Sequence, residues 1–281
     1  MDLGLQMWSV HDICVNEGFE AVMKRIKPMG YNGFEFAINS GATLSERVGY
    51  KVDPKELKHM MDHYGVKPIG SHIDLGALLR EPETVLEECL ALELPYVGTG
   101  PSFEADRLPK PDQIARNERI AKAAKLLQAN GIQLQVHCAA YGWMNDYKGR
   151  LTSEGMIEDA GGLDYLEPEL DLAWLVCAGL DPVEYMQKYK GHLGIVHFKD
   201  FHTLPEWSEY ILVRHNTICE HGYGCAVGEN GVLDLEAFVN AARENKAEWI
   251  VTELWNEPES MKNAKISADN LKKYLIPSDI S

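Results

Sequence analysis

The chain has 281 residues, 45% of them hydrophobic, and its 27 Lys and Arg against 43 Asp and Glu give a formal net charge of −16. This excess of negative charge repels nucleic-acid phosphates over most of the surface, which argues against a nucleic-acid-binding protein. No window resembles a signal peptide or a membrane span, and the six cysteines form no Cys-x-x-Cys pair. We therefore expect a cytoplasmic protein with reduced thiols and with neither a nucleic-acid nor a membrane partner.

Short apolar runs recur along the chain and alternate with stretches of helical periodicity. The predicted strands cover residues 3–8, 33–37, 66–71, 95–99, 132–137, 168–172, 193–198 and 249–253. The predicted helices cover residues 18–28, 53–64, 82–93, 111–129, 181–190, 234–245 and 259–275. This alternation predicts a parallel sheet in an α/β protein, and eight strands followed by helices or long connections predict a single (β/α)8 TIM barrel.

Capping residues support the predicted helices. Two long connections lie between the predicted helices and strands. Asp53-Pro54 and Asp181-Pro182 each place an N-cap carboxylate before a proline at the first helical position. The connections 138–166 and 201–231 follow strands five and seven, and we expect extended loops there, over the mouth of the barrel. No Gly-x-Gly-x-x-Gly follows an early strand and no linker divides the chain, so residues 1–281 are expected to form one barrel domain rather than a doubly wound fold.

Four of the predicted strands end in a side chain that can bind a metal ion. These residues are His137, Asp171, His197 and Glu253. The C-terminal ends of parallel barrel strands open onto one mouth, so ligands far apart in sequence can converge there. Two imidazoles and two carboxylates suit Mn²⁺, Zn²⁺, Co²⁺ or Fe²⁺, with Mg²⁺ less favoured because of the two nitrogens. We predict one divalent cation; for each residue taken alone, a satisfied polar side chain or a helix cap is the alternative.

Several motifs of the chain are distinctive. They are Leu3-Gly-Leu-Gln-Met-Trp-Ser-Val, Gly30-Tyr-Asn-Gly-Phe-Glu-Phe-Ala, Gly70-Ser-His-Ile, Glu169-Leu-Asp-Leu-Ala-Trp, Gly179-Leu-Asp-Pro-Val-Glu-Tyr, Val196-His-Phe-Lys-Asp and Val227-Gly-Glu-Asn-Gly-Val-Leu-Asp. With them the chain resembles, over nearly its whole length, the xylose isomerase-like TIM barrels. That superfamily of sugar phosphate isomerases and epimerases also includes inosose dehydratase, ketose 3-epimerases and endonuclease IV. The run from Glu169 to Asp200 carries the most specific part of the resemblance.

The resemblance also implies a set of metal ligands. In that family one ligand from each of strands five to eight holds the cation, and the last ligand is a glutamate, which matches Asp171, His197 and Glu253. Many members have a glutamate where this chain has His137. A branch closer to this chain has Tyr-His-Asn-His there, of which this chain keeps the first histidine and has Ala139 in place of the second. This departure weakens a mechanism that needs two mirror-image glutamates.

The hypothesis for the chemistry is proton abstraction next to the carbonyl of a keto-sugar. A cation would stabilise the enediolate that forms when the proton leaves. Glu253 is the preferred base, because a carboxylate that touches both metal and substrate can take the proton. Lys199 shares the inward strand face with His197 and is the second catalytic candidate, as a donor to the oxyanion. An ion pair of Lys199 with Asp200 or Glu169 is the alternative.

Four further residues are predicted to bind the substrate. Glu35 and His72 end strands two and three, where their side chains could hold sugar hydroxyls. Glu169 lies one layer deeper than Asp171 on the same face and could orient a ligand. Trp8 follows strand one and could supply an aromatic wall for a sugar. A structural polar role, or for Trp8 a core role, is the alternative at each position.

Together these residues predict a divalent-metal-dependent sugar isomerase or epimerase of carbohydrate metabolism, with a small sugar or keto-sugar as its substrate. The main alternative is a metal-dependent lyase or dehydratase acting on a keto-inositol or a 3-keto-glycoside, since both reactions start from the same enediolate. A non-catalytic sugar-binding subunit is less favoured, and a nuclease least of all. No glycine-rich phosphate cradle with a basic neighbour follows strands seven and eight, which favours an unphosphorylated substrate. The sequence leaves the oligomeric state open, a homo-oligomer included.

Overall fold

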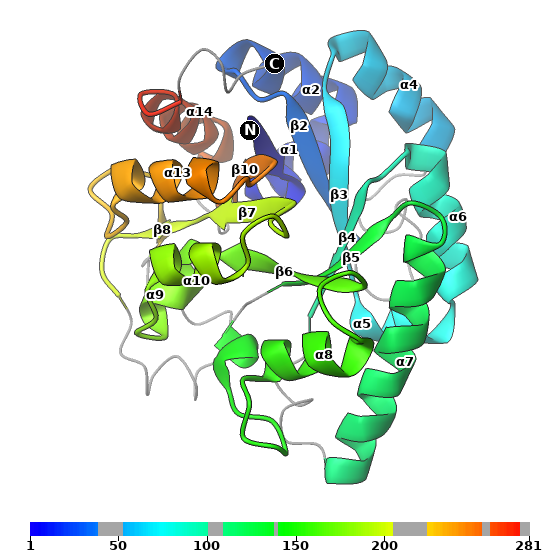
Figure 1. The fold of residues 1–281 in the computed structure, drawn as a ribbon. Coiled ribbons are helices and arrows are strands. Elements are labelled where there is room, and N and C mark those ends of the chain that lie inside the picture. The colour runs from blue at the N-terminus through cyan, green and yellow to red at the C-terminus, as the bar shows by residue number, and fades with distance from the viewer. Residues whose placement is uncertain (39–52, 101–108, 138–139, 205–223, 255–258, 276–281) are drawn as a thin grey trace. The chain divides into compact units, whose positions relative to one another are not determined.

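The computed structural model describes residues 1–38, 53–100, 109–137, 140–204, 224–254 and 259–275. Eight parallel strands form a closed barrel in the order β1-β10-β7-β6-β5-β4-β3-β2, so the first strand pairs with the last (Figure 1). The bounds are β1 Asp2–Gln6, β2 Gly33–Ile38, β3 Lys67–Ile73, β4 Tyr96–Thr99, β5 Gln133–His137, β6 Leu166–Asp171, β7 Ile195–Phe198 and β10 Trp249–Thr252. The predicted TIM barrel is confirmed, and each strand overlaps its predicted run.

Helices follow most of the strands. They are α1 His11–Glu17, α2 Phe19–Met29, α4 Pro54–Tyr64, α5 Leu75–Arg80, α6 Pro82–Leu92, α7 Lys110–Gln128, α8 Thr152–Ala160, α9 Leu172–Cys177, α10 Pro182–Lys188, α13 Leu235–Glu244 and α14 Ser260–Leu271, with the 3-10 helices η1 Met7–Val10 and η3 Ala140–Trp143. The proposed caps are present: Asp181 accepts the N–H of Val183 at 2.8 Å, and Asp53 accepts the N–H of Lys55 at 2.9 Å.

Four of these helices were not predicted: α1, α5, α8 and α9. They are short, from six to nine residues. In α9 the apolar run Leu-Ala-Trp-Leu-Val-Cys is buried nearly all round and leaves no amphipathic period to detect. The long connection after β5 therefore contains η3 and α8, whereas most of the connection after β7 lies outside the described residues. Its described ends form a short antiparallel pair, β8 Asp200–Phe201 with β9 Gly224–Cys225.

The chain divides into two compact units. Unit 1 comprises Met1–Phe36, His59–Pro68 and Leu170–Ser281, and unit 2 comprises Ala37–Lys58 and Ile69–Glu169. Within unit 1, α14 packs against β10 and α2, and α10 packs against α13 (Figure 1). Within unit 2, α8 packs along α7. Both chain ends belong to unit 1, so its strands come from distant parts of the sequence.

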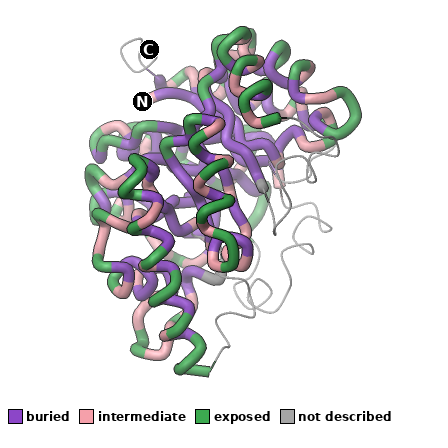
Figure 2. Tube along the Cα trace, turned by 90° about the vertical axis from the view of Figure 1, so that its right-hand side faces the viewer, coloured by how far each residue is buried: buried purple, intermediate pink, exposed green. Residues whose placement is uncertain are grey.

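The strands are buried along most of their length, as the purple segments in Figure 2 show. On β2, Phe34 and Phe36 pack against Phe19 of α2 with ring centroids 6.2 and 5.9 Å apart. Side chains alternate across a strand, so Glu35, which lies between the two phenylalanines, points to the opposite face. Glu35 is fully buried there. The helix-facing side of β2 thus supplies apolar packing, and its other side carries a buried charge.

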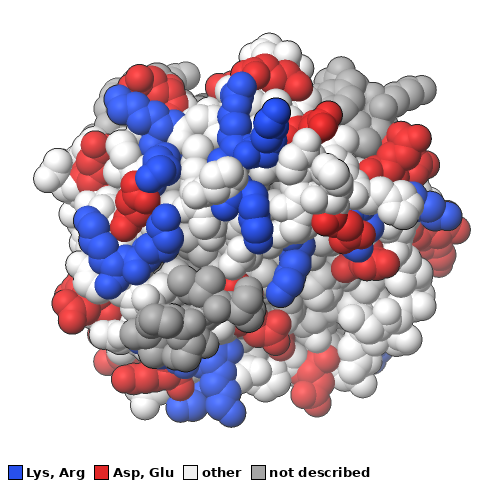
Figure 3. Space-filling model, turned by 90° about the horizontal axis from the view of Figure 1, so that it is seen from above, with Lys and Arg blue, Asp and Glu red and all other residues white. Residues whose placement is uncertain are grey.

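The surface carries charges of both signs. On the face seen in Figure 3, Lys and Arg side chains lie among Asp and Glu side chains. Exposed ion pairs such as Lys262–Glu259, with Nζ and Oε2 2.7 Å apart, contribute little to stability because water screens the two charges. Across the described ranges, no helix has both the length and the hydropathy needed to cross a bilayer. The described cysteines, Cys14, Cys89, Cys177 and Cys225, are buried.

Arg150 anchors the connection that follows β5. Its guanidinium forms ion pairs with Asp146, Glu158 and Asp159, and Nη1 lies 3.0 Å from an oxygen of Asp159. The Asp146 side chain is 2% exposed and also accepts the backbone N–H of Lys148 at 2.7 Å. Burial alone would raise the pKa of both aspartates, but the hydrogen bonds from Arg150 hold the pKa of each below its usual value. This cluster fixes the connection within unit 2.

Replacing Arg150 by Met should flatten the acid limb of the stability curve. The pKa values of Asp146 and Asp159 are lower in the folded state than the ordinary value of 3.8. Their stabilising contribution is therefore complete above about pH 4 and is lost as the pH falls through the lowered folded-state values. Urea unfolding should show a steeper loss of unfolding free energy below about pH 4 in the wild type than in Arg150→Met.

The matched control is Arg25→Met, which removes an exposed ion pair with Glu17 in unit 1. Because exposed pairs contribute little, this variant should keep the acid slope of the wild type. If the unfolding free energies of the wild type and Arg150→Met fell equally steeply below about pH 4, Arg150 would not be the group that lowers the pKa values of Asp146 and Asp159.

Candidate functional site

Five charged or titratable side chains gather in unit 1 where its strands end. They are Glu35 of β2, Asp171 of β6, His197 and Lys199 at and after the end of β7, and Glu253 just after β10, and we call them the unit 1 cluster. The strand register brings them level, because Asp171 pairs with His197 and Val251 pairs with the same histidine. Residues two apart on a strand share a face, so Glu253 and Lys199 follow Val251 and His197 on the same side.

His197 connects two carboxylates. Its Nδ1 lies 2.8 Å from Oε2 of Glu253, and its Nε2 lies 2.8 Å from Oε2 of Glu35. A neutral imidazole has one N–H donor, so both contacts are hydrogen bonds only if the ring carries two protons or one carboxyl group is protonated. Glu35 thus contacts a residue that we predicted as a metal ligand, whereas the sequence suggested that it holds a substrate hydroxyl.

Lys199 forms the second pair of contacts in the cluster. Its Nζ lies 3.0 Å from Oδ2 of Asp171 and 3.1 Å from Oε2 of Glu253, and its side chain is 2% exposed. The ammonium also lies 5.0 Å from the ring centroid of Trp174. Burial alone would lower the pKa of Lys199, but the two carboxylates hold it above its ordinary value. Lys199 thus forms ion pairs with Asp171 and Glu253, two partners that were not predicted.

Asp171 serves the fold and the cluster with different oxygens. Its Oδ1 accepts the backbone N–H of Trp174 at 3.2 Å and so caps the N-terminus of α9. Its Oδ2 faces the Lys199 ammonium. Burial raises the pKa of Asp171, and the positive charge of Lys199 acts in the opposite direction. The helix cap therefore fixes the orientation of a carboxylate that belongs to the cluster.

Asp200, the residue after Lys199, has a structural role. Its buried carboxylate accepts backbone N–H groups from Phe201, Gly228, Val232 and Leu233 at 2.9 to 3.2 Å. Burial raises the pKa of Asp200, and these hydrogen bonds oppose the rise. The Val227–Asp234 motif is thus folded around one carboxylate.

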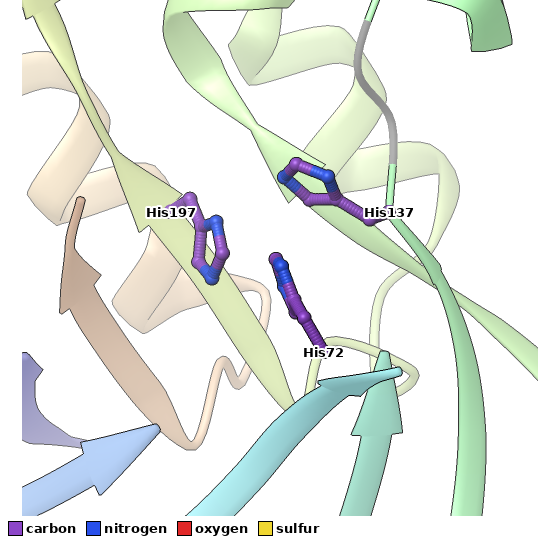
Figure 4. Close-up of side chains that lie close together, drawn as sticks. All are labelled: His72, His137 and His197. Carbon is purple, nitrogen blue, oxygen red and sulfur yellow. The ribbon is translucent and has the colours of Figure 1, made fainter. Parts of the chain in front are cut away.

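Unit 2 has a smaller set of polar side chains at the ends of its own strands. His72 of β3 lies 3.1 Å from Glu169 of β6, measured from Nε2 to Oε2. Figure 4 shows the rings of His72 and His137 side by side, with centroids 4.5 Å apart. The figure also labels His197, which stands on β7 in unit 1. The last residue of β5, His137, pairs in register with Glu169. We call His72, His137 and Glu169 the unit 2 cluster.

Two residues around the unit 2 cluster were missed from the sequence. A Cβ atom on Gly98 would lie 2.3 Å from Oε2 of Glu169 and 2.7 Å from Cδ2 of His72, so only glycine leaves room for both side chains. Gln135 is fully buried, and among the described residues its side-chain amide has no hydrogen-bond partner. Two signals could have found them: a glycine inside a short strand, and the alternation that puts Gln135 on the face of His137.

Trp8 lies in η1, directly after β1, and its half-buried ring is 4.8 Å from the ring of His11. Trp174 is fully buried against Phe201, with ring centroids 5.1 Å apart, and is a core residue. Ala139 lies outside the described residues.

The donor atoms of the unit 1 cluster fit a divalent cation. Asp171, His197 and Glu253 offer carboxylate oxygens and an imidazole nitrogen, the set that Mn²⁺, Co²⁺ and Zn²⁺ accept. The three side chains are held by one another, by Lys199 or by the α9 cap, at distances of 2.8 to 3.2 Å. Such preorientation by neighbouring hydrogen bonds is usual for metal ligands.

Comparison with known proteins gives a family match and a set of related folds. The model of the xylose isomerase-like TIM barrel family matches residues 23–274. No curated protein matches the chain significantly. A sugar phosphate isomerase/epimerase structure from Parabacteroides distasonis ATCC 8503 is 19% identical, with 100% of this chain and 99% of that chain covered and a TM-score of 0.75.

Two further solved structures share the fold. The probable 3-DHS dehydratase AsbF from Bacillus anthracis is 12% identical, with 97% and 99% of the two chains covered and a TM-score of 0.75. The IOLI protein with a binding zinc atom is 15% identical, with 98% and 96% covered and a TM-score of 0.71. At these identities the structures establish a common fold.

The close approach at Gly98 can be tested by adding one methyl group. Gly98→Ala should lower the free energy of unfolding by about 1–3 kcal/mol, because the buried Glu169 has little room to move away from the new Cβ. Urea unfolding measures the loss. In a Glu169→Ala background the same substitution should cost clearly less, since the nearest clashing atom is gone. Equal costs in both backgrounds would show that Glu169 does not occupy this position.

Proposed function

Because the chain belongs to the xylose isomerase-like TIM barrel family, we propose that it is a divalent-metal-dependent sugar isomerase or epimerase. The observation that carries the proposal is the convergence of Asp171, His197 and Glu253 at the ends of neighbouring strands of unit 1. Side chains at the C-terminal ends of the barrel strands build the active sites of this fold. The sugar phosphate isomerase/epimerase from Parabacteroides distasonis has a similar fold.

The proposed ligands are His137, Asp171, His197 and Glu253, one from each of four consecutive strands of the barrel order. Zn²⁺, Mn²⁺ and Co²⁺ suit this donor set best, and Mg²⁺ is the less favoured choice. The IOLI protein, which has a similar fold, has a zinc atom in its structure. When bound, the cation would polarise the substrate's ketone oxygen and so favour loss of the neighbouring proton.

Glu253 is the proposed base. Of the three carboxylates in the unit 1 cluster it is the one whose side chain retains exposure, 10%, whereas Glu35 and Asp171 are fully enclosed. A base must reach the substrate, so this exposure distinguishes Glu253 from the other two. Its contact with His197 restricts its orientation, and that restriction reduces the entropy lost when the carboxylate meets the α-proton.

Lys199 would keep its proton and donate a hydrogen bond to the oxygen that becomes negative when the α-proton leaves. Two carboxylates at 3.0 and 3.1 Å stabilise its positive charge, which makes it a better hydrogen-bond donor than proton donor. Glu35, His72, Glu169 and Trp8 remain proposed substrate-binding or orienting residues. The contact of Glu35 with His197 favours an orienting role for that carboxylate.

A lyase or dehydratase reaction is the second candidate. It begins with the same proton abstraction and ends with loss of a hydroxyl or glycosyl group from the carbon beyond. The similar fold of the probable 3-DHS dehydratase supports keeping this candidate.

We also propose that the substrate is a keto-sugar and that residues 1–281 form one domain. The protein would act in the cytoplasm and would bind no nucleic acid.

Metal content tests the ligand set. Purified wild-type protein reconstituted with Mn²⁺ should bind about one ion per chain, and chelation should abolish turnover until Mn²⁺ or Co²⁺ is returned.

Asp171→Asn should lose most of the bound metal while it keeps an amide oxygen to cap α9. Elemental analysis after gel filtration measures the content. Asp181→Asn, which alters the cap of α10 in the same way, should retain the wild-type metal content. Full activity in a verified metal-free preparation would refute the metal mechanism.

Glu253→Gln tests the base. The amide cannot accept the α-proton, so kcat should fall by about 10²- to 10⁴-fold on any keto-sugar that the wild type converts. NMR in D₂O on a panel of keto-sugars separates the two reactions. Deuterium at the carbon next to the carbonyl indicates isomerisation or epimerisation, and loss of water or aglycone indicates the lyase. Glu244→Gln, at the exposed end of α13, is the control and should leave kcat unchanged. Unchanged turnover in Glu253→Gln would assign the base to another residue.

A further inference from the structure

We propose that Lys199 is an internal counter-ion that holds the candidate ligands Asp171 and Glu253 in place before metal binds and then competes with the metal for them. This inference rests on the metal site of the proposed function. The two oxygens that face the Lys199 ammonium, Oδ2 of Asp171 and Oε2 of Glu253, belong to side chains assigned to the cation. The metal and the lysine therefore draw on the same negative charge.

Burial explains why a cation is needed at this place. Glu35 and Asp171 are fully buried, and Glu253 retains 10% exposure. Burying a carboxylate without a positive partner costs several kcal/mol. Lys199 supplies positive charge to this place, because its ammonium contacts two of the three carboxylates at once. Without it, the metal-free cluster would contain three buried carboxylates and one imidazole.

The charge balance shows why Lys199 alone is insufficient. The two contacts of His197 with carboxylates are both hydrogen bonds only if the metal-free cluster holds one extra proton, so these five side chains then keep one negative charge beside Lys199. Metal ligation needs a neutral imidazole, and three ionised carboxylates, one ammonium and a neutral imidazole carry two negative charges, which a divalent cation would cancel. The lysine therefore neutralises the cluster only in part, and a divalent ion would displace the extra proton.

The surroundings keep Lys199 in position. The ammonium lies 5.0 Å from the Trp174 ring centroid, within the range of a cation–π contact. Asp171 is held from the other side by the N-terminus of α9, since Trp174 donates its N–H to Oδ1. Trp174 therefore contacts both partners of the ion pair, Lys199 with its ring and Asp171 with its backbone N–H. This arrangement gives the ammonium a fixed place beside the carboxylates rather than a variable surface position.

The test is Lys199→Met, which keeps the length of the side chain and removes its charge. Two effects of opposite sign are expected. The melting temperature of the metal-free protein should fall by about 5–15 °C, because buried carboxylates lose their partner. The affinity for Mn²⁺, measured by isothermal titration calorimetry without substrate, should rise at least about tenfold, because a positive charge next to the ion is gone.

A surface lysine provides the control. Lys262→Met removes an exposed ion pair with Glu259 in the same unit and should change neither the melting temperature nor the Mn²⁺ affinity appreciably. If Lys199→Met does not fold without metal, it should fold when Mn²⁺ is supplied. The double variant Lys199→Met/Glu253→Gln should regain part of the metal-free stability, because it removes one charge of each sign.

Different results would refute the metal site and the counter-ion role of Lys199. A wild-type protein that shows no Mn²⁺ binding refutes the metal site, while the melting temperature of metal-free Lys199→Met still tests the counter-ion role. A wild type that binds Mn²⁺ with the same affinity and metal-free stability as Lys199→Met overturns the counter-ion role and leaves the metal site standing. Weaker Mn²⁺ binding by Lys199→Met would also overturn it, because it would show that the lysine assists the metal.

Discussion

Three carboxylates are buried in the described part of unit 1, and their negative charge has to be stabilised there. Glu35, Asp171 and Glu253 are all turned inward from strands whose other faces supply the apolar core. Ionised carboxylates are stable in such a place only when positive charge or hydrogen-bond donors lie beside them. His197, Lys199 and the backbone N–H at the start of α9 meet part of this requirement. In the proposed function a divalent cation would meet the rest of this requirement, so that fold stability and catalysis would depend on one arrangement of charges.

The sequence predicted the fold well because barrel strands have a strong local signature. A short apolar run with turn residues around it marks each strand, and the cap-and-proline pairs at Asp53 and Asp181 mark helix starts. The short helices were missed where that signature fails: α9 is apolar nearly all round, and α8 contains Gly155 in its interior. These helices are stabilised by packing and capping against the rest of the unit, and a single segment shows neither.

The residues that converge in unit 1 could be proposed from the sequence, but the contacts between their atoms could not. Strand ends gave Asp171, His197 and Glu253, because a polar residue after an apolar run stands out. Which atoms meet depends on register between strands that are distant in sequence, and Glu35 and His197 are 162 residues apart. The contacts of Lys199 with Asp171 and Glu253 were therefore not predicted. Gly98 has no chemical group at all, so its importance emerges only when the side chains around it are placed.

The pairing of β1 with β10 has a consequence for biosynthesis. Unit 1 takes its strands from both ends of the chain, whereas most of unit 2 is the continuous stretch Ile69–Glu169. Domains fold as their residues leave the ribosome, and contacts between distant residues form slowly. We therefore expect unit 2 to gain structure first. One edge of β1 should stay unpaired until β10 has been synthesised. The charged cluster is then completed in the last steps of folding, when the cell's pool of divalent ions can first reach it.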